Sequence, residues 1–343
     1  MNVPLAQDIG DDATPYLKSY LAPFASYLVR PDVTDIYVNA SGELWVETLQ
    51  GGIERHAAPG LDDTALWRLA RQIASLSHQG ISREHPLLSA SLPDGSRVQV
   101  VAPPATRGPL ALAIRKHVAA DLRLADYVRA GAFASTRLGP RDEVVEADRE
   151  IAALEKVGDV PGLLAVAVRA RKNILIAGGA AAGKTTFLNA LIGEIPARER
   201  LVIIEDTPEL RLQHDNAVGL LAVKGHLGEA RVTTDDLLQA SLRMRPDRII
   251  LGELRGQEAY TFLRAVNTGH PGSMTTIHAD SPAGAVEQLA LIVLQAGTRL
   301  SREDIVRYVG SVVDVFVQLA NDGGRRHVAN VVIGRRPAHA PPP

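Results

Sequence analysis

The sequence contains no cysteine among its 343 residues. This absence excludes a disulfide framework, a thiolate-bound zinc and a cysteine nucleophile, and it agrees with a reducing compartment. Aromatic residues are also scarce, at 4% of the chain, although hydrophobic residues make up 46%. The core is therefore expected to be aliphatic, and few side chains remain for stacking on the bases of single-stranded nucleic acid.

Neither sign of charge is in excess, because 37 Lys and Arg face 39 Asp and Glu. Without an overall positive field, no sequence-specific binding of nucleic acid is expected. Long apolar runs are missing too, since those at 174–177, 201–204 and 312–320 fall short of the about 20 residues that cross a bilayer. The acidic start MNVPLAQDIGDD lacks the pattern of a secretory signal. We therefore expect a cytoplasmic protein whose membrane contact, where it has one, is peripheral.

The length allows about two domains, each with a core of its own. In the first part, helices are expected at 15–30 and 62–76, and strands at 34–39, 43–48, 97–103 and 110–115. This mixture predicts an α+β domain over residues 1–117. The charged stretch 118–158 has no strong strand signal and is typical of a helical linker.

In the second part, expected strands alternate with expected helices. The strands are at 173–177, 201–205, 248–251 and 273–277, and the helices at 184–192, 235–243, 258–266 and 282–294. This order predicts a wound, largely parallel α/β sheet with helices on both faces, over residues 159–335. Helix starts are indicated by Ser281 before Pro282 and by the spacings Thr233 to Asp236 and Ser301 to Asp304. The tail 336–343 is expected to be disordered.

The most specific motif is GGAAAGKT at 178–185, which fits G-x-x-x-x-G-K-[ST] between an apolar strand and a helix. The backbone N–H groups of such a loop surround phosphate oxygens, and the amino terminus of the helix adds partial positive charge. Lys184 would neutralise the β- and γ-phosphates, and Thr185 would place its hydroxyl on Mg²⁺. The predicted nucleotide-binding residues are Gly178, Gly179, Ala180, Ala181, Ala182, Gly183, Lys184, Thr185 and Thr186.

Polar side chains follow three further strands, where the carboxyl ends of parallel strands would meet. Strand 201–205 leads to Glu205 and Glu209, either of which could orient a water in line with the γ-phosphate. Glu253 follows the next strand and is long enough to act on a metal through a bound water. His278 follows the last one and could contact the γ-phosphate, although alone it also fits a structural histidine. Together these residues predict an NTPase core.

Four segments resemble the Walker A, Asp, Walker B and His boxes of the secretion NTPases, in that order. They are GGAAAGKTT at 178–186, IEDTPEL at 204–210, LRMRPDRIILGELRG at 242–256 and GHPGSMTTIHA at 269–279. The branch to which the chain is most similar is the type IV secretion and conjugation traffic ATPase, the eleventh component of the VirB type. The resemblance extends into the first domain through DIYVNASGELWVE at 35–47, LPDGSRVQVVAPP at 92–104 and IRK at 114–116.

This resemblance implies a RecA-like P-loop ATPase domain after the smaller α+β domain, in a homohexameric ring that binds ATP and Mg²⁺ between the domains. It implies partners among inner-membrane secretion-channel components and other secretion ATPases, at the inner face of the bacterial inner membrane. Glu209 would activate the water with Glu205 beside it, and Glu253 would act at the metal with Thr185. His278 would contact the γ-phosphate.

Arginines of the first domain reach the phosphates in this family, and the matching positions are Arg97 and Arg115, which also fit surface arginines. Arg243, Arg245 and Arg255 match the pattern without an assigned role. The chain departs from the family at Ala180, Ala181 and Ala182, where small polar and glycine residues are usual. Alanine is disfavoured at positive φ, so an alanine where the loop requires glycine would strain it and slow turnover.

The leading hypothesis is a Mg²⁺-dependent ATPase motor that energises type IV secretion, conjugative transfer and pilus biogenesis. One alternative is an assembly ATPase of type IV pili or type II secretion. Another is a nucleotide-gated secretion scaffold with little hydrolysis, which the alanine-rich loop favours. A nucleic-acid translocase is disfavoured by the charge balance and the few aromatics, and a small-molecule kinase would leave the first domain unexplained.

Overall fold

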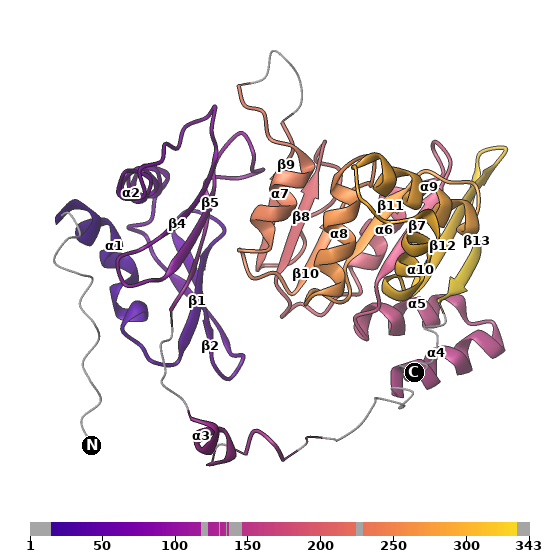
Figure 1. Ribbon diagram of the computed structural model, residues 1–343, viewed down its shortest axis with the longest axis horizontal. Coiled ribbons are helices and arrows are strands. Elements are labelled where there is room, and N and C mark those ends of the chain that lie inside the picture. Colours follow the sequence, from indigo (N-terminus) through magenta and orange to yellow (C-terminus); the bar gives the residue numbers. More distant parts are fainter. Residues whose placement is uncertain are drawn as a thin grey trace.

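The computed structural model describes residues 15–117, 123–129, 131–134, 136, 146–223 and 229–334. The predictions for the start of the chain and for the tail at 336–343 lie outside these ranges. The described residues form two sheets, each with its own helices (Figure 1). The predicted α/β architecture, with a smaller α+β part before the P-loop part, is confirmed.

The first sheet has six antiparallel strands in the order β3-β2-β1-β6-β5-β4. Its elements are α1 (Pro15–Leu28), β1 (Val33–Val38), β2 (Glu43–Thr48), β3 (Ile53–Ala57), α2 (Asp63–Leu76), β4 (Leu87–Ser91), β5 (Arg97–Val101) and β6 (Ala111–Arg115). Successive side chains of a strand face opposite sides. Ile36 therefore packs with Leu21 of α1 and Leu69 of α2, whereas Tyr37 belongs to a core shared with the second sheet.

The second sheet has seven strands in the order β13-β12-β7-β11-β10-β8-β9, and within it only β12 and β13 pair antiparallel. Its elements are α5 (Val160–Arg169), β7 (Ile174–Gly178), α6 (Lys184–Ile192), β8 (Leu201–Glu205), β9 (Ala217–Leu221), α7 (Thr234–Ser241), β10 (Arg248–Leu251), α8 (Glu258–Asn267), β11 (Met274–Ile277), α9 (Pro282–Gln295), α10 (Arg302–Val312), β12 (Val315–Asp322) and β13 (Arg325–Ile333).

Helices cover both faces of this sheet, as predicted. Ile174 and Ile176 of β7 pack in one core with α5 and α6, whereas Leu175 and Ala177 pack in another with α7 to α10. The predicted helix starts are confirmed too. Ser281 caps α9, and capping boxes begin α7 and α10.

The expected linker contains α3 (Leu124–Arg129) and α4 (Glu146–Val157) in its described parts. Ile151 of α4 packs with Leu164 and Ala167 of α5, so α4 lies against the second sheet's helices. The division of the chain at 117 and 158 stays a prediction. None of the helices in the described ranges has the length and apolar character of a membrane span.

A buried arginine joins the two sheets. Arg200, just before β8, is 1% exposed, and its guanidinium lies 3.9 Å from the ring centroid of Tyr37 in β1. Its Nη1 donates hydrogen bonds to the Oδ1 atoms of Asn39 (2.8 Å) and Asn216 (2.5 Å), and its Nε donates one to the carbonyl of Met244. Burial lowers the pKa of Arg200 to about 10, which leaves it charged at neutral pH.

Replacing Arg200 should weaken the packing between the two sheets. Arg200→Met keeps an apolar stem but removes the cation and its hydrogen bonds, so we expect the free energy of unfolding to fall by about 2–3 kcal/mol. The matched control, Arg83→Ala, removes an ion pair with Glu229 in which both side chains are 58% exposed, and we expect a change within about 0.5 kcal/mol. Denaturant unfolding measures both variants, and equal losses of stability would contradict a stabilising role for the contacts of Arg200.

Candidate active site

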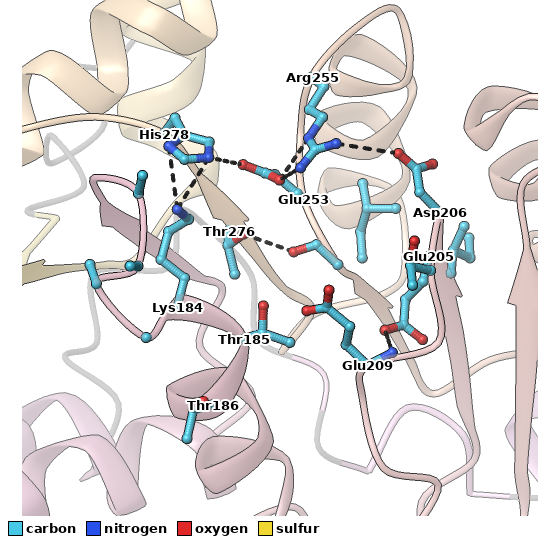
Figure 2. Close-up of a pocket in the computed structure, with 18 of the residues that line it drawn as sticks. Lys184, Thr185, Thr186, Glu205, Asp206, Glu209, Glu253, Arg255, Thr276 and His278 are labelled. Carbon is cyan, nitrogen blue, oxygen red and sulfur yellow. Dashed lines mark hydrogen bonds and ion pairs between the residues drawn. The ribbon is translucent and has the colours of Figure 1, made fainter. Parts of the chain in front are cut away.

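A cavity of about 470 Å³ opens at the carboxyl ends of β7, β8, β10 and β11 (Figure 2). The predicted residues that line it are Ala180, Ala181, Ala182, Gly183, Lys184, Thr185, Thr186, Glu205, Glu209, Glu253 and His278. The parallel register of the strands brings them together, because they lie at or just beyond the carboxyl ends of these strands. Gly178 and Gly179 do not line the cavity, but their carbonyls accept hydrogen bonds from Nζ of Lys184 at 3.0 and 3.2 Å.

The phosphate loop turns through two residues in the left-handed region. Gly183, the N-cap of α6, has φ +91°, and Ala181 has φ +57°. Ala182 is buried in the core beneath the loop, whereas Ala180 and Ala181 are exposed. Ala181 thus has a backbone conformation that glycine adopts with less strain. This is the strain expected from the departure of the loop from the family pattern.

The two carboxylates after β8 have different surroundings. Glu205 is 4% exposed, and its Oε1 accepts hydrogen bonds from the backbone N–H groups of Glu209 (2.9 Å) and Leu210 (2.8 Å). Its Oε2 is paired with Arg107. These contacts favour a role for Glu205 in holding the loop, and its catalytic role stays a prediction. Glu209 is exposed, and its carboxylate makes no hydrogen bond to another described residue.

Glu253 lies in the middle of the cavity. Its Oε1 is 3.0 Å from Nε2 of His278, and its Oε2 accepts a hydrogen bond from Nε of Arg255 at 2.7 Å. Nζ of Lys184 lies 3.4 Å from both ring nitrogens of His278, so three titratable groups form a chain across the cavity. Burial lowers the pKa of Lys184, and Glu253 opposes this effect. Phosphate oxygens at this place would stabilise the charged ammonium further.

Several lining residues were not predicted. Arg255 reaches Glu253, and its Nη1 lies 3.8 Å from Oδ2 of Asp206. Thr234 donates a hydrogen bond of 3.1 Å to the other carboxylate oxygen of Asp206, Oδ1. Arg326 enters from β13, and its Cδ would be 3.3 Å from a Cβ placed on Gly183. The sequence singles out Arg255 in the Walker B segment but predicts no role for it. No sequence signal indicates Arg326, because the hairpin of β12 and β13 was not expected.

Arg97 and Arg115 do not line this cavity in the single chain, and their contact with phosphate stays a prediction. They line a second cavity of about 630 Å³ together with Arg243. Nε of Arg115 donates a hydrogen bond of 3.0 Å to Asp35. Both arginines belong to the antiparallel strands β5 and β6 of the first sheet, in directly paired positions.

The strain at Ala181 is testable with a neighbouring control. Ala181→Gly should relieve about 1–2 kcal/mol of left-handed strain, which exceeds the about 0.4–1 kcal/mol that glycine costs through the unfolded chain. We expect the free energy of unfolding to rise by up to about 1 kcal/mol. Ala180→Gly, at a residue without positive φ, should only lower it. Equal effects in denaturant unfolding would show that the loop is unstrained.

The chain matches the family described as type II/IV secretion system protein over residues 20–318. It is 35% identical to the type IV secretion system protein VirB11 of Bartonella henselae over 336 residues, which are 94% of each chain. It is 40% identical to VirB11 of Brucella suis over 321 residues, 91% of this chain and 88% of that protein.

A solved structure extends these likenesses to the fold. The VirB11 ATPase from the Brucella suis type IV secretion system, in complex with sulphate, superimposes with a TM-score of 0.86 at 38% identity. The match covers 93% of this chain and 97% of that one. The relatives therefore favour the type IV secretion branch over the pilus and type II branch considered from the sequence. The chain belongs to the type II/IV secretion system protein family and, within it, to the VirB11 ATPases of type IV secretion systems.

Proposed function

We propose that the chain works as a hexameric motor that couples Mg²⁺-dependent ATP hydrolysis to type IV secretion, conjugative transfer and pilus biogenesis. The observation that carries the proposal is the convergence of Lys184, Glu209, Glu253 and His278 on one cavity at the end of the P-loop sheet. The related VirB11 proteins are named for type IV secretion systems, so the partners would be inner-membrane channel components and other secretion ATPases. The protein would act at the inner face of the bacterial inner membrane.

Each residue has a role that its surroundings support. The backbone of 178–186 would hold the phosphates, with Lys184 against the β- and γ-phosphates. Thr185 and Glu253 would hold Mg²⁺, since magnesium in nucleotide sites takes one or two protein oxygens besides phosphate and water. The bound ion would neutralise developing charge on the phosphates. Glu209, whose carboxylate is free to accept a proton from water, would orient the attacking water, and His278 would contact the γ-phosphate.

Arg97 and Arg115 would complete the site of a neighbouring subunit. They are remote from the cavity of their own chain but line an open one, together with Arg243. Positive charge placed on transferring phosphate from a second subunit is a common device in such NTPases. A homohexameric ring supplies that second subunit.

Turnover of ATP with Mg²⁺ across a series of protein concentrations tests the motor, while light scattering follows the mass. We expect turnover per subunit to rise as a ring assembles, and to fall by about 100-fold or more in Lys184→Ala and Glu209→Gln. Chelation of Mg²⁺ should abolish it. If wild-type turnover equals that of both variants while nucleotide still binds, the chain acts as a nucleotide-gated scaffold instead.

Mixed rings test the arginines. Arg97→Ala with Arg115→Ala in one chain, and Glu209→Gln in another, should each be inactive alone. If the arginines serve a neighbour, an equimolar mixture should regain activity at about a quarter of its sites, because random pairing puts an intact Glu209 beside intact arginines that often. A mixture that stays as inactive as its components would overturn the shared site.

A further inference from the structure

A segment of the first domain pairs with one edge of the second sheet, the strand β9. β9 is the edge strand of that sheet, next to the first domain in Figure 1. Residues 105–107, between β5 and β6, pair with it antiparallel through a bridge of Thr106 with Leu220. The N–H of Leu221 donates to the carbonyl of Ala105, and the N–H of Arg107 donates to the carbonyl of Gly219, each at 2.9 Å.

From this position the side chain of Arg107 crosses β9 and reaches the loop after β8. It passes over Gly219, where a Cβ would lie 2.6 Å from Cδ of Arg107. Its Nη2 pairs with Oε2 of Glu205, and its Nη1 donates a hydrogen bond of 2.5 Å to the carbonyl of Leu210. The side chain is 13% exposed and that of Glu205 is 3% exposed. The pair is thus largely buried. Charge-assisted hydrogen bonds away from water are strong and depend closely on geometry.

These contacts fix both ends of the loop that carries Glu209. Glu205 accepts hydrogen bonds from the N–H groups of Glu209 and Leu210. Its ion pair with Arg107 therefore fixes the carboxylate to which the loop is hydrogen-bonded. On the other side, Asn189 of α6 donates to the carbonyl of Glu209 at 3.3 Å and accepts the N–H of Arg211 at 2.8 Å. The loop is therefore held between the helix of the phosphate loop and the first domain.

We propose that Arg107 is a positioning residue for hydrolysis, which makes the placement of Glu209 depend on the seating of the first domain against β9. This inference rests on the proposed role of Glu209 as the group that orients water. A displacement of a catalytic group by about 1 Å can cost about 100-fold in rate. Arg107 contacts Glu205 but does not line the cavity, so its loss should change the rate and not the affinity for nucleotide.

Four variants of the full chain separate this role from a merely structural one. Arg107→Ala removes the contact. Arg107→Lys keeps a cation for Glu205 but not the fork that also reaches Leu210. Gly219→Ala leaves every site residue in place and displaces Arg107 through its new Cβ. Arg83→Ala, the matched control, removes an exposed ion pair with Glu229. The kcat and KM for ATP are measured in each, with light scattering for assembly and circular dichroism for folding.

We expect kcat to fall by about 10-fold or more in Arg107→Ala and by less in Arg107→Lys and Gly219→Ala, with KM within about twofold of wild type. Arg83→Ala should match wild type. If Arg107→Ala does not fold, Arg107→Lys and Gly219→Ala carry the test, because both keep a positively charged side chain at position 107.

Two results would overturn the inference. One is an unchanged kcat in the folded variants, and the other is a rise of KM that accounts for the whole loss. Glu209→Gln separates this from the proposed function. If Glu209→Gln turns over ATP like wild type, the role of Glu209 itself fails. If it is inactive while the Arg107 and Gly219 variants keep the kcat of wild type, only the role of Arg107 fails.

Discussion

The parallel pairing of β7, β11, β10 and β8 determines where the chemistry of this protein lies. Parallel strands end at the same edge of a sheet, so the first polar residues after each strand meet although they are separated by up to about a hundred residues in sequence. The strands themselves are buried along their whole length. The polar groups of the cavity therefore lie at or beyond the carboxyl ends of the strands: Glu205 is the last residue of β8, and Lys184, Glu253 and His278 follow β7, β10 and β11.

Local signals account for what the sequence predicted well. The strand before the phosphate loop, the start of α6 at Lys184 and the capping boxes of α7 and α10 depend on neighbouring residues, and all are found. β9 was not predicted, because Gly219 interrupts a short strand and glycine weakens a strand signal. Gly219 leaves room for the side chain of Arg107, which comes from the first domain. A contact between residues so far apart in the chain cannot be read from the sequence.

The sequence predicted which residues line the cavity, but not the different surroundings of its two neighbouring carboxylates. Glu205 and Glu209 are carboxylates four positions apart after the same strand, and nothing in the sequence distinguishes them. The structure distinguishes them by burial and by the partners of Glu205. A buried carboxylate that accepts backbone hydrogen bonds holds a loop in place, whereas an exposed one remains accessible to water. Two like groups with different environments take different tasks. Arg97 and Arg115 illustrate the other limit, since their proposed use depends on a second subunit that one chain does not contain.

The backbone pairing of residues 105–107 with β9 also has a consequence for solubility. An edge strand with unpaired N–H and C=O groups is a template on which another chain can add a strand. β9 is short, apolar and nearly devoid of charge, so it has few of the features that protect natural edges. An ATPase domain expressed without residues 1–117 would expose this edge. The pairing of residues 105–107 with β9 thus protects this edge against aggregation.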